Sequence, residues 1–503
     1  MHALPLNQLF KGFVNDAFDI AETAKSSGLA WDSRQVKKGD LFFACDGEML
    51  HGKKFVKPAV KAGAVAIALE TDDINEAYRL SRELDGCPVI PVADLTQKLG
   101  DIAARFYADP SRKMLIIGVT GTNGKTSVTH LLAQCLNSQR EPCGVIGTMG
   151  AGLWGKLQNV QNTTPGAVEL QQRLYDMYEQ GGKYVAMEVS SHALAQGRTK
   201  GCDFDIAVFT NLTQDHLDYH GDMKSYGEAK LKLFTYSGLN QVVLNLDDNF
   251  SQTIIRSLPT GISVIGITLK SSQQHYSGID VIVGSVIKAN DQGMTIAVDS
   301  PFGCGEIKTK LLGDFNASNL LVVLACAVGL GLSVDDVCKR LAEIKAPAGR
   351  LEKFGGGNKP LVVVDYAHTP DALEKVLSTL KKQTAGKLFV MMGCGGDRDP
   401  LKRPEMGAVA EAYADVIYLT NDNPRTESPE RIIDGILKGI SNPALVIVEL
   451  DRERAIRKVI SQAKKTDVVL IAGKGHEEYQ IVGDNRTHFS DRKIVAELLG
   501  EAA

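Results

Sequence analysis

One stretch constrains the fold of this chain more than any other: an apolar run, a glycine-rich loop and a helical pattern in direct succession. The run is MLIIGVT, the loop GTNGKT ends at Thr126, and the helical pattern extends to about Leu136. Backbone N–H groups exposed by Gly121 and Gly124 can surround phosphate oxygens, with Lys125 on the β- and γ-phosphates and the Thr126 hydroxyl on Mg²⁺. The order strand, loop, helix predicts a nucleotide site, and the alternative is a glycine-rich turn without a ligand.

The loop departs from the common phosphate-binding pattern at one position. That pattern has a glycine five residues before the glycine of Gly-Lys-Thr, and this chain has Val119 there. The lysine and the threonine are kept while the glycines are shifted. The loop therefore predicts a nucleotide enzyme outside the commonest class.

Strand-like and helix-like segments alternate along the chain and predict an α/β protein of three domains. A chain of 503 residues is too long for one core, since a domain takes roughly 100–200 residues. The first segment, 1–111, contains the strands DLFFA and AVAIALE and closes with Asp109-Pro110-Ser111, which breaks the pattern and predicts a linker. We expect it to be a smaller α/β domain.

The other two segments carry the larger sheets. Segment 112–346 has buried strands ending in polar residues (YVAMEVS, DIAVFTNL, VVLNLDD), which predicts a central parallel sheet with its ligands at the carboxyl ends. Residues 263–310 read as a small mixed-sheet insertion, followed by a helix in GDFNASNLLVVLACAVGL. Segment 347–503 alternates five strands with four helices and predicts a doubly wound, Rossmann-like domain. Within it, Gly393-Cys-Gly-Gly396 reads as a turn, because no helix pattern follows directly.

Composition and charge exclude several classes of function. A net charge of −4 without a basic run argues against a nucleic-acid partner. No stretch of about 18 apolar residues predicts a membrane span, and the opening MHALPLNQLFKGFVNDAF lacks the pattern of a secretory signal. The nine cysteines are scattered singly with no C-x-x-C pair, so we expect reduced thiols and a cytoplasmic location. We also expect a monomer.

Ten further stretches, together with GTNGKT, resemble landmarks of the Mur ligase superfamily, and within it of the UDP-N-acetylmuramoyl-tripeptide synthetases. In chain order they are DSRQVKKGDLFFA, QNTTPG, MEVSSHALAQGR, NLTQDHLDYHG, YGEAK, GDFNASN, VDYAHTPD, GCGGDRD, TNDNPR and AGKGHEEYQ. The resemblance implies an ATP-dependent ligase that adds meso-2,6-diaminopimelate to UDP-N-acetylmuramoyl-L-alanyl-D-glutamate through an acyl phosphate. The alternatives within the superfamily are a lysine-adding ligase and a folylpolyglutamate synthetase. The first 111 residues argue against the folylpolyglutamate synthetase.

The resemblance implies roles for residues near the nucleotide and for a catalytic group of four. ATP is expected at Gly121, Thr122, Asn123, Gly124, Lys125, Thr126, Ser127, Asn316, Asn319, Arg350, Asp365 and His368. The catalytic residues are expected to be Lys125, Glu188, His216 and Lys230. Taken singly, the residues around the adenine and ribose could equally be helix-capping or interdomain polar residues.

Three of these side chains are also expected to bind Mg²⁺ together with Thr126. Glu188 ends a buried strand and His216 follows another, so both should project toward the phosphate loop, although a lone histidine is more often a core or surface residue. Charge patterning alone puts Lys230 on a solvated helix face. The resemblance implies that it is carbamylated, and carbamate oxygens suit magnesium whereas an ammonium is repelled by it.

The sugar nucleotide is expected to meet the first domain and the adjoining part of the second. By resemblance its contacts are Trp31, Ser33, Glu48, Met49, Leu50, Asn162, Thr163, Thr164, Ser190, Gln196 and Arg198. Glu48-Met49 departs from the His-Gln found in some relatives.

The incoming amino acid is expected at the stretch TNDNPR. Diaminopimelate carries a second carboxylate at its far end, which lysine lacks, and the planar guanidinium of Arg425 can hold it by two parallel bonds, with Arg398 as a further anchor. The resemblance extends this site to Asp422, Asn423, Pro424, Gly473 and Glu477, the last meeting an ammonium of the substrate. The alternative for 422–425 is a strand-to-helix turn with a solvated arginine, and the two are compatible.

A rival from another class is a nucleotide-dependent switch without chemistry. It accounts for the loop but leaves TNDNPR, QNTTPG and the third α/β segment unexplained. A ligase releases ADP and phosphate only when both the sugar nucleotide and the amino acid are present, whereas a switch does not depend on them.

Overall fold

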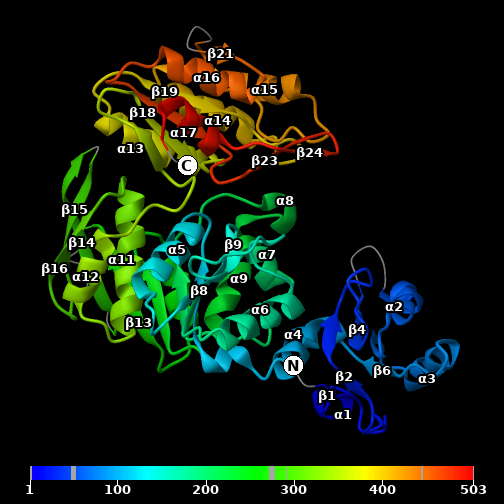
Figure 1. The fold of residues 1–503 in the computed structure, drawn as a ribbon. Coiled ribbons are helices and arrows are strands. Elements are labelled where there is room, and N and C mark those ends of the chain that lie inside the picture. The colour runs from blue at the N-terminus through cyan, green and yellow to red at the C-terminus, as the bar shows by residue number, and fades with distance from the viewer. Residues whose placement is uncertain (1–2, 47–51, 271–277, 291, 443–445, 502–503) are drawn as a thin grey trace. The chain divides into compact units, whose positions relative to one another are not determined.

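The structure is a computed structural model that describes residues 3–46, 52–270, 278–290, 292–442 and 446–501 (Figure 1). The chain divides into two compact units. Unit 1 comprises residues 1–118, 137–207 and 229–239, and unit 2 comprises residues 119–136, 208–228 and 240–503. Strands β7 (Leu115–Thr120) and β11 (Ile206–Phe209) begin in unit 1 and end in unit 2. No helix in the described part of the chain combines the length and the apolar character needed to cross a membrane.

The N-terminal region of unit 1 is built on a parallel sheet in the order β3-β4-β5-β6. Its elements are β1 (Leu4–Pro5), α1 (Leu6–Leu9), β2 (Lys25–Ser26), β3 (Gly28–Ala30), β4 (Asp40–Ala44), η1 (Gly52–Phe55), α2 (Val56–Ala62), β5 (Ala66–Glu70), α3 (Ile74–Glu83), β6 (Val89–Val92) and α4 (Leu95–Phe106). Side chains of β4 alternate between its two faces, as a strand requires. Leu41 and Phe43 pack with α1 and α4, while Phe42 and Ala44 pack with α2 and α3. The region therefore has three layers, and it is of the α/β class that the sequence predicts.

The middle of the chain forms one long sheet in the order β16-β15-β14-β13-β12-β11-β7-β10-β8-β9. Besides β7 and β11 its elements are η2 (Pro110–Lys113), α5 (Lys125–Leu136), β8 (Cys143–Gly147), β9 (Gly150–Leu153), α6 (Ala167–Glu179), β10 (Tyr184–Glu188), α7 (Ser191–Ala195), α8 (Leu217–His220), α9 (Met223–Leu231), η3 (Lys232–Thr235), β12 (Gln241–Asn245), α10 (Phe250–Ser257), β13 (Ser263–Thr268), β14 (Asp280–Asn290), β15 (Gly293–Asp299), β16 (Gly305–Thr309), α11 (Asp314–Gly329) and α12 (Val334–Ala342). The helices predicted at α5 and α11 are both present.

The expectation of a separate insertion at residues 263–310 needs correction. The segment is mixed, as predicted, because β14, β15 and β16 pair antiparallel. However, β13 pairs in parallel with both β12 and β14, so these strands extend the main sheet and form no sheet of their own. The physical reason is that the open edge of β12 offers backbone hydrogen bonds that a following strand can satisfy.

The C-terminal region of unit 2 is the predicted doubly wound domain. Its elements are β17 (Glu352–Gly355), β18 (Leu361–Asp365), α13 (Pro370–Gln383), β19 (Leu388–Met392), α14 (Lys402–Tyr413), β20 (Val416–Leu419), α15 (Pro429–Leu437), β21 (Val446–Val448), α16 (Arg452–Gln462), β22 (Val468–Ala472), β23 (Tyr479–Val482), β24 (Asn485–His488) and α17 (Asp491–Leu499). The sheet order is β17-β18-β22-β19-β20-β21, parallel from β18 onward.

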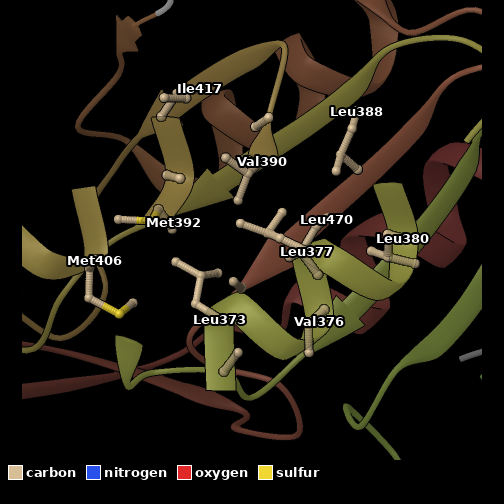
Figure 2. Close-up of a cluster of buried hydrophobic side chains, with 14 of the residues drawn as sticks. Leu373, Val376, Leu377, Leu380, Leu388, Val390, Met392, Met406, Ile417 and Leu470 are labelled. Carbon is tan, nitrogen blue, oxygen red and sulfur yellow. The ribbon is translucent and has the colours of Figure 1, made fainter. Parts of the chain in front are cut away.

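Helices cover both faces of this sheet. On one face, α13, α14 and α15 pack onto a large apolar cluster that includes Leu373, Val390 and Leu470 (Figure 2). On the other face, α16 and α17 pack through Ile456 and Val495. Because both faces are buried, the loops that follow the strands are where polar chemistry can be placed. The α/β class and the three sheet regions are confirmed.

Candidate active site

The shifted glycine of the phosphate loop has a steric cause. Gly121 has φ +148°, and a Cβ there would lie 1.9 Å from the hydroxyl oxygen of Thr210 at the end of β11. That hydroxyl donates to the carbonyl of Asn123 at 2.6 Å, so it is fixed in place. Val119, by contrast, is a buried residue inside β7. The glycine is therefore required at 121, where the loop crosses the neighbouring strand, and is not required at 119.

The rest of the loop is fixed by the segment after β11 and by its own lysine. The N–H of Thr122 donates to the carbonyl of Asn211 at 2.8 Å, and the N–H of Asn123 donates to the side chain of Asn211 at 2.9 Å. The ammonium of Lys125 donates to the carbonyls of Gly121 (2.8 Å) and Thr122 (2.9 Å). A cation thus lies over the loop at the N-terminus of α5, where a helix also favours an anion.

His216 reaches this loop through an aromatic neighbour. Its ring meets the ring of Tyr226 edge-on at 6.1 Å, and the Tyr226 hydroxyl is 3.2 Å from the hydroxyl of Thr122. His216 has φ +55°, an uncommon conformation for a residue other than glycine. The prediction that His216 lies beside the phosphate loop therefore agrees with the geometry of unit 2.

A half-buried carboxylate, Asp215, links three of the predicted residues electrostatically. Burial alone would raise the pKa of Asp215, but His216, His368 and Lys125 lower it below its ordinary value. The imidazole Nε2 of His216 is 3.3 Å from the Asp215 carboxylate. The carboxylate is thus held ionised among the groups that are expected to meet the triphosphate.

Arg350 ties the C-terminal region to the first turn of α5. Its Nη2 donates to the Thr126 hydroxyl at 3.2 Å, and its guanidinium lies 4.5 Å from the ring centre of Tyr366. The neighbouring Asp365 accepts the N–H groups of Leu351 and Ala367, each at 2.7 Å. Burial raises the pKa of Asp365, and Arg350 opposes that rise.

The two asparagines on α11 also approach the loop. Asn319 donates to the side-chain oxygen of Asn316 at 3.2 Å, and Asn316 donates to the carbonyl of Leu312 at 2.9 Å. A Cβ on Gly124 would lie 3.0 Å from the Asn319 oxygen. Unit 2 therefore gathers the residues predicted for ATP.

A second group of predicted residues meets around Glu188 in unit 1. The carboxylate accepts the N–H of Thr148 at 2.8 Å, and the Glu188 carbonyl accepts the Thr164 hydroxyl at 2.8 Å. Thr164 in turn accepts the N–H of Ser190 at 3.0 Å, and Arg198 donates to the Thr164 carbonyl at 3.3 Å. The hydroxyl of Thr163 lies 3.1 Å from the hydroxyl of Thr148. Gln196 directly follows α7, and Asn162 is exposed. The structure brings most of the predicted sugar-nucleotide residues of the second segment together.

Lys230 is buried, with 1% of its surface exposed. The interpretation of this lysine as part of a solvated helix face is therefore wrong, because α9 turns that side inward. Among the described residues, no group of three or more His, Cys, Asp or Glu side chains is arranged to hold a metal. Any magnesium site here would depend on hydroxyl, carbamate or substrate oxygens as well.

The first segment contributes an exposed aromatic residue. Trp31 is 51% exposed, and a Cβ on Gly166 of the QNTTPG stretch would lie 3.9 Å from its ring. Ser33 is half-buried two residues later. The predictions for Glu48, Met49 and Leu50 fall outside the described residues.

The predicted amino-acid residues converge from two loops of the C-terminal sheet. Nη1 of Arg425 donates to the carbonyl of Gly396 at 2.6 Å, and the N–H of Gly396 donates to the carbonyl of Asn423 at 2.9 Å. A Cβ on Gly395 would contact both the Arg425 guanidinium (3.0 Å) and the stem of Arg398 (3.7 Å). Two arginine side chains thus flank one glycine. No helix follows 393–396 directly, since α14 begins only at residue 402.

Glu477 lies next to the same turn. Its Oε2 accepts from Asn423 at 3.0 Å and from the ammonium of Lys474 at 2.9 Å, and its Oε1 accepts from the Tyr479 hydroxyl at 3.2 Å. Gly473 has φ +112°, and a Cβ there would lie 2.6 Å from the Asp422 carboxylate. Glycine is therefore needed where the end of β22 passes the end of β20.

Sequence reasoning missed three residues that these contacts bring in. Lys474 stands in the stretch AGKGHEEYQ directly after a buried strand, which was a signal that its side chain lies at the carboxyl edge of the sheet. Thr148 gave no comparable signal, because its partner Glu188 lies 40 residues away. Tyr226 opens the stretch YGEAK, but its partner Thr122 lies 104 residues away.

Comparisons with known proteins agree with this geometry. Three family models match: "Mur ligase family, catalytic domain" over residues 25–107, "Mur ligase middle domain" over 119–327, and "Mur ligase, glutamate ligase domain" over 349–475.

Full-length relatives carry one common name. A UDP-N-acetylmuramoyl-L-alanyl-D-glutamate–2,6-diaminopimelate ligase from Ectopseudomonas mendocina is 44% identical over 97% of this chain and 96% of its own. The protein of that name from Coxiella burnetii is 45% identical over 92% of this chain and 93% of its own. A solved structure of a ligase with this name is 34% identical, covers 99% of both chains and has a TM-score of 0.70.

Proposed function

This chain belongs to the Mur ligase family, a family of ATP-dependent ligases, and we propose that it joins meso-2,6-diaminopimelate to UDP-N-acetylmuramoyl-L-alanyl-D-glutamate in peptidoglycan precursor synthesis. The names of relatives that are 44–45% identical over more than nine tenths of the chain support this reaction, as does that of the solved structure at 34% identity. The proposed parts are a sugar-nucleotide domain at 1–111, an ATP domain at 112–346 and an amino-acid domain at 347–503.

The observation that carries the choice of amino acid is the pair of guanidinium side chains at Gly395. Arg425 and Arg398 both border this glycine, and Arg425 is held by the Gly396 carbonyl at 2.6 Å. A substrate with a carboxylate at its far end is recognised well by such a pair. Lysine, which ends in an ammonium, would be repelled there. The carboxylate of Glu477 provides the matching partner for an ammonium of the same substrate.

The reaction proceeds in two transfers. A carboxylate oxygen of the D-glutamyl residue attacks the γ-phosphorus of ATP, the bond to the β-phosphate oxygen breaks, and ADP leaves. The amine of diaminopimelate then attacks the acyl carbon, loses a proton, and displaces inorganic phosphate. The first step brings two anions together, so the Lys125 ammonium over the loop lowers the repulsion between carboxylate and triphosphate. No protein nucleophile takes part.

We propose that the metal of this reaction is magnesium. By resemblance, the hydroxyl of Thr126, the carboxylate of Glu188, the imidazole of His216 and a carbamylated Lys230 would hold it. Magnesium takes oxygen ligands and commonly binds through one or two carboxylates plus substrate phosphates, so a closed cage of protein ligands is not needed. When bound, it neutralises charge on the triphosphate.

We also propose that the reaction takes place in the cytoplasm with a monomeric enzyme. All nine cysteines are among the described residues and all are free thiols, which suits a reducing compartment.

The test is an amino-acid panel with the purified protein, ATP, Mg²⁺ and the UDP-dipeptide. We expect meso-diaminopimelate to give ADP, phosphate and a tripeptide product of the corresponding mass, and lysine to give far less. Equal product from lysine would refute the role of the arginine pair. ADP release that does not depend on the acceptor and the amino acid would favour a nucleotide switch.

A further inference from the structure

A lysine that has no role in the proposed reaction is completely buried beside the amino-acid residues. Lys474 follows β22, and its side chain is 0% exposed. Its ammonium donates to Asn423 Oδ1 at 3.0 Å and to Glu477 Oε2 at 2.9 Å. Burying an ammonium costs much free energy unless it is paired and hydrogen-bonded. Both of its partners here are residues assigned to the binding of the amino acid.

The contacts of Lys474 fix the orientation of the Asn423 amide. Asn423 Oδ1 accepts from Lys474 and from the N–H of Ile481 at 3.0 Å, while its NH₂ group donates to Glu477 at 3.0 Å. An ammonium can only donate, so the amide oxygen has to face Lys474 and the NH₂ group has to face Glu477. Lys474 and the N–H of Ile481 therefore fix together which end of the amide each neighbour meets.

The two oxygens of Glu477 are used unequally. Oε2 receives two donors, Asn423 and Lys474, whereas Oε1 receives the Tyr479 hydroxyl at the longer distance of 3.2 Å as its one donor among the described residues. A carboxylate oxygen accepts about two hydrogen bonds, so Oε1 retains capacity for one more. Lys474 and Asn423 thus occupy one side of the carboxylate and leave the other side for a ligand.

The carboxylate of Glu477 also acts on a second buried cation. Arg452 is fully buried and makes two bonds to Asp491, at 2.8 and 2.7 Å. Burial lowers the pKa of Arg452, but Asp491, Asp422 and Glu477 more than offset this and raise it above its ordinary value. Glu477 therefore remains a charged acceptor at this position.

We propose that Lys474 is a positioning residue for diaminopimelate: it holds Asn423 and Glu477 as one unit, so that Glu477 Oε1 receives an ammonium of the substrate. This inference rests on the proposed function. A lysine that serves only to stabilise the fold would affect the binding of all three substrates or none, whereas a positioning lysine affects the binding of the amino acid alone.

The primary variant is Lys474→Met, which keeps the length of the side chain and removes its charge. We expect the KM for diaminopimelate to rise about 10- to 100-fold, the loss expected for a charge-assisted hydrogen bond. The KM values for ATP and for the UDP-dipeptide are expected to stay within about twofold, since neither contacts this group. The control is Lys493→Met, which removes an ion pair of the same 2.9 Å length, to Glu478, that is half-exposed. It should leave all three KM values unchanged.

A double-mutant cycle tests whether Lys474 acts through Glu477. In a Glu477→Gln background, Lys474→Met should change the KM for diaminopimelate by less than about threefold, because the carboxylate it positions is gone. Should Lys474→Met fail to fold, Lys474→Gln keeps an N–H donor without the charge and should show the same selective rise, smaller in size. An unchanged KM for diaminopimelate in the folded variant, an equal rise for all substrates, or full additivity in the cycle would each overturn the inference. If the wild-type enzyme does not use diaminopimelate, the proposed function itself is wrong, and this result is distinct from those that overturn the role of Lys474.

Discussion

Arg425 and Gly396 join the two loops of the proposed amino-acid site: the guanidinium Nη1 of Arg425 donates to the Gly396 carbonyl at 2.6 Å. The backbone of Arg425 is fixed as well. Its N–H donates to Ile481 at 3.2 Å, its carbonyl accepts from Gly483 at 2.7 Å, and it has φ +51°, a conformation that a non-glycine residue adopts only at some cost. The hairpin β23–β24 therefore holds a strained arginine in one place, which suits a residue that selects a ligand.

Arg425→Ala should raise the KM for diaminopimelate more than it changes the KM for either of the other two substrates. The variant loses a charge-assisted pair with the far carboxylate, on the order of 1.5–3 kcal/mol, or about 10- to 150-fold in KM. Steady-state kinetics with each substrate varied in turn would measure this. The control is Arg457→Ala, which removes an exposed pair with Glu453 on α16. Normal diaminopimelate kinetics in Arg425→Ala would remove this residue from the site.

Lys125→Ala should abolish turnover and leave the fold intact. The Lys125 ammonium is bound by two loop carbonyls, and β7 and α5 are held by their own packing, so its loss affects the charge over the loop more than the structure. We expect kcat to fall by more than about 100-fold, as for the loss of a group that stabilises charge in the transition state. ADP release gives the rate and circular dichroism the fold. A rate near that of the wild type would refute the nucleotide assignment.

Local patterns in the sequence were sufficient for the elements that carry the site. The run into Gly121 and Lys125 predicts strand, loop and helix, and the helix at α11 is predicted from its continuous apolar stretch. The ends of buried parallel strands point to the loops that carry Asn423 and Glu477, because all such ends meet at one edge of a sheet, and these two side chains share a hydrogen bond of 3.0 Å.

What the sequence could not reveal depends on contacts far along the chain. Arg452 opens the stretch RERAIRKV, which reads as a solvated helix, yet it is fully buried because Asp491, 39 residues later, pairs with it. Lys230 is also buried, although the charged residues around it likewise predict a solvated helix face. The strand at 263–268 joins the main sheet because β12 offers it an edge. Charge and periodicity describe one segment at a time, whereas the burial of a side chain depends on the distant segment that packs against it.

Removing only one partner of the ion pair between Arg452 and Asp491 should destabilise the protein strongly. Both side chains are fully buried, and Arg452 also donates to the carbonyls of Asn421 (3.2 Å) and Ala472 (3.0 Å), which follow or end β20 and β22. Arg452→Met leaves a buried carboxylate without its partner and should destabilise the protein by about 3–5 kcal/mol.

The double variant Arg452→Met/Asp491→Leu should be more stable than Arg452→Met alone, because no uncompensated charge remains buried. Thermal melting of the two variants and the wild type would measure this. A double variant that melts below the single one would show that the pair is not the source of the loss.

Two histidines, the buried His130 and the half-buried His476, predict a loss of stability in mild acid. Burial, followed by the charge of Arg350, lowers the pKa of His130 to about 4 and that of His476 to about 3, from an ordinary value of 6.5. The unfolded chain therefore binds more protons than the folded one below pH 6.5. Their contribution to stability is complete above pH 6.5 and is lost as the pH falls toward the folded pKa values, at about 1.4 kcal/mol per pH unit for each histidine.

The variant His476→Gln isolates one of these two contributions. Its free energy of unfolding should fall less steeply than that of the wild type between pH 6.5 and pH 4, since one of the two protons is no longer taken up on unfolding. The control is His488→Gln, at an exposed position on β24. Denaturant unfolding at several pH values gives all three slopes. Equal slopes for His476→Gln and the wild type would mean that His476 is already protonated in the folded protein, and the ring that packs 5.2 Å from Tyr366 would then have to carry a charge beside Arg350.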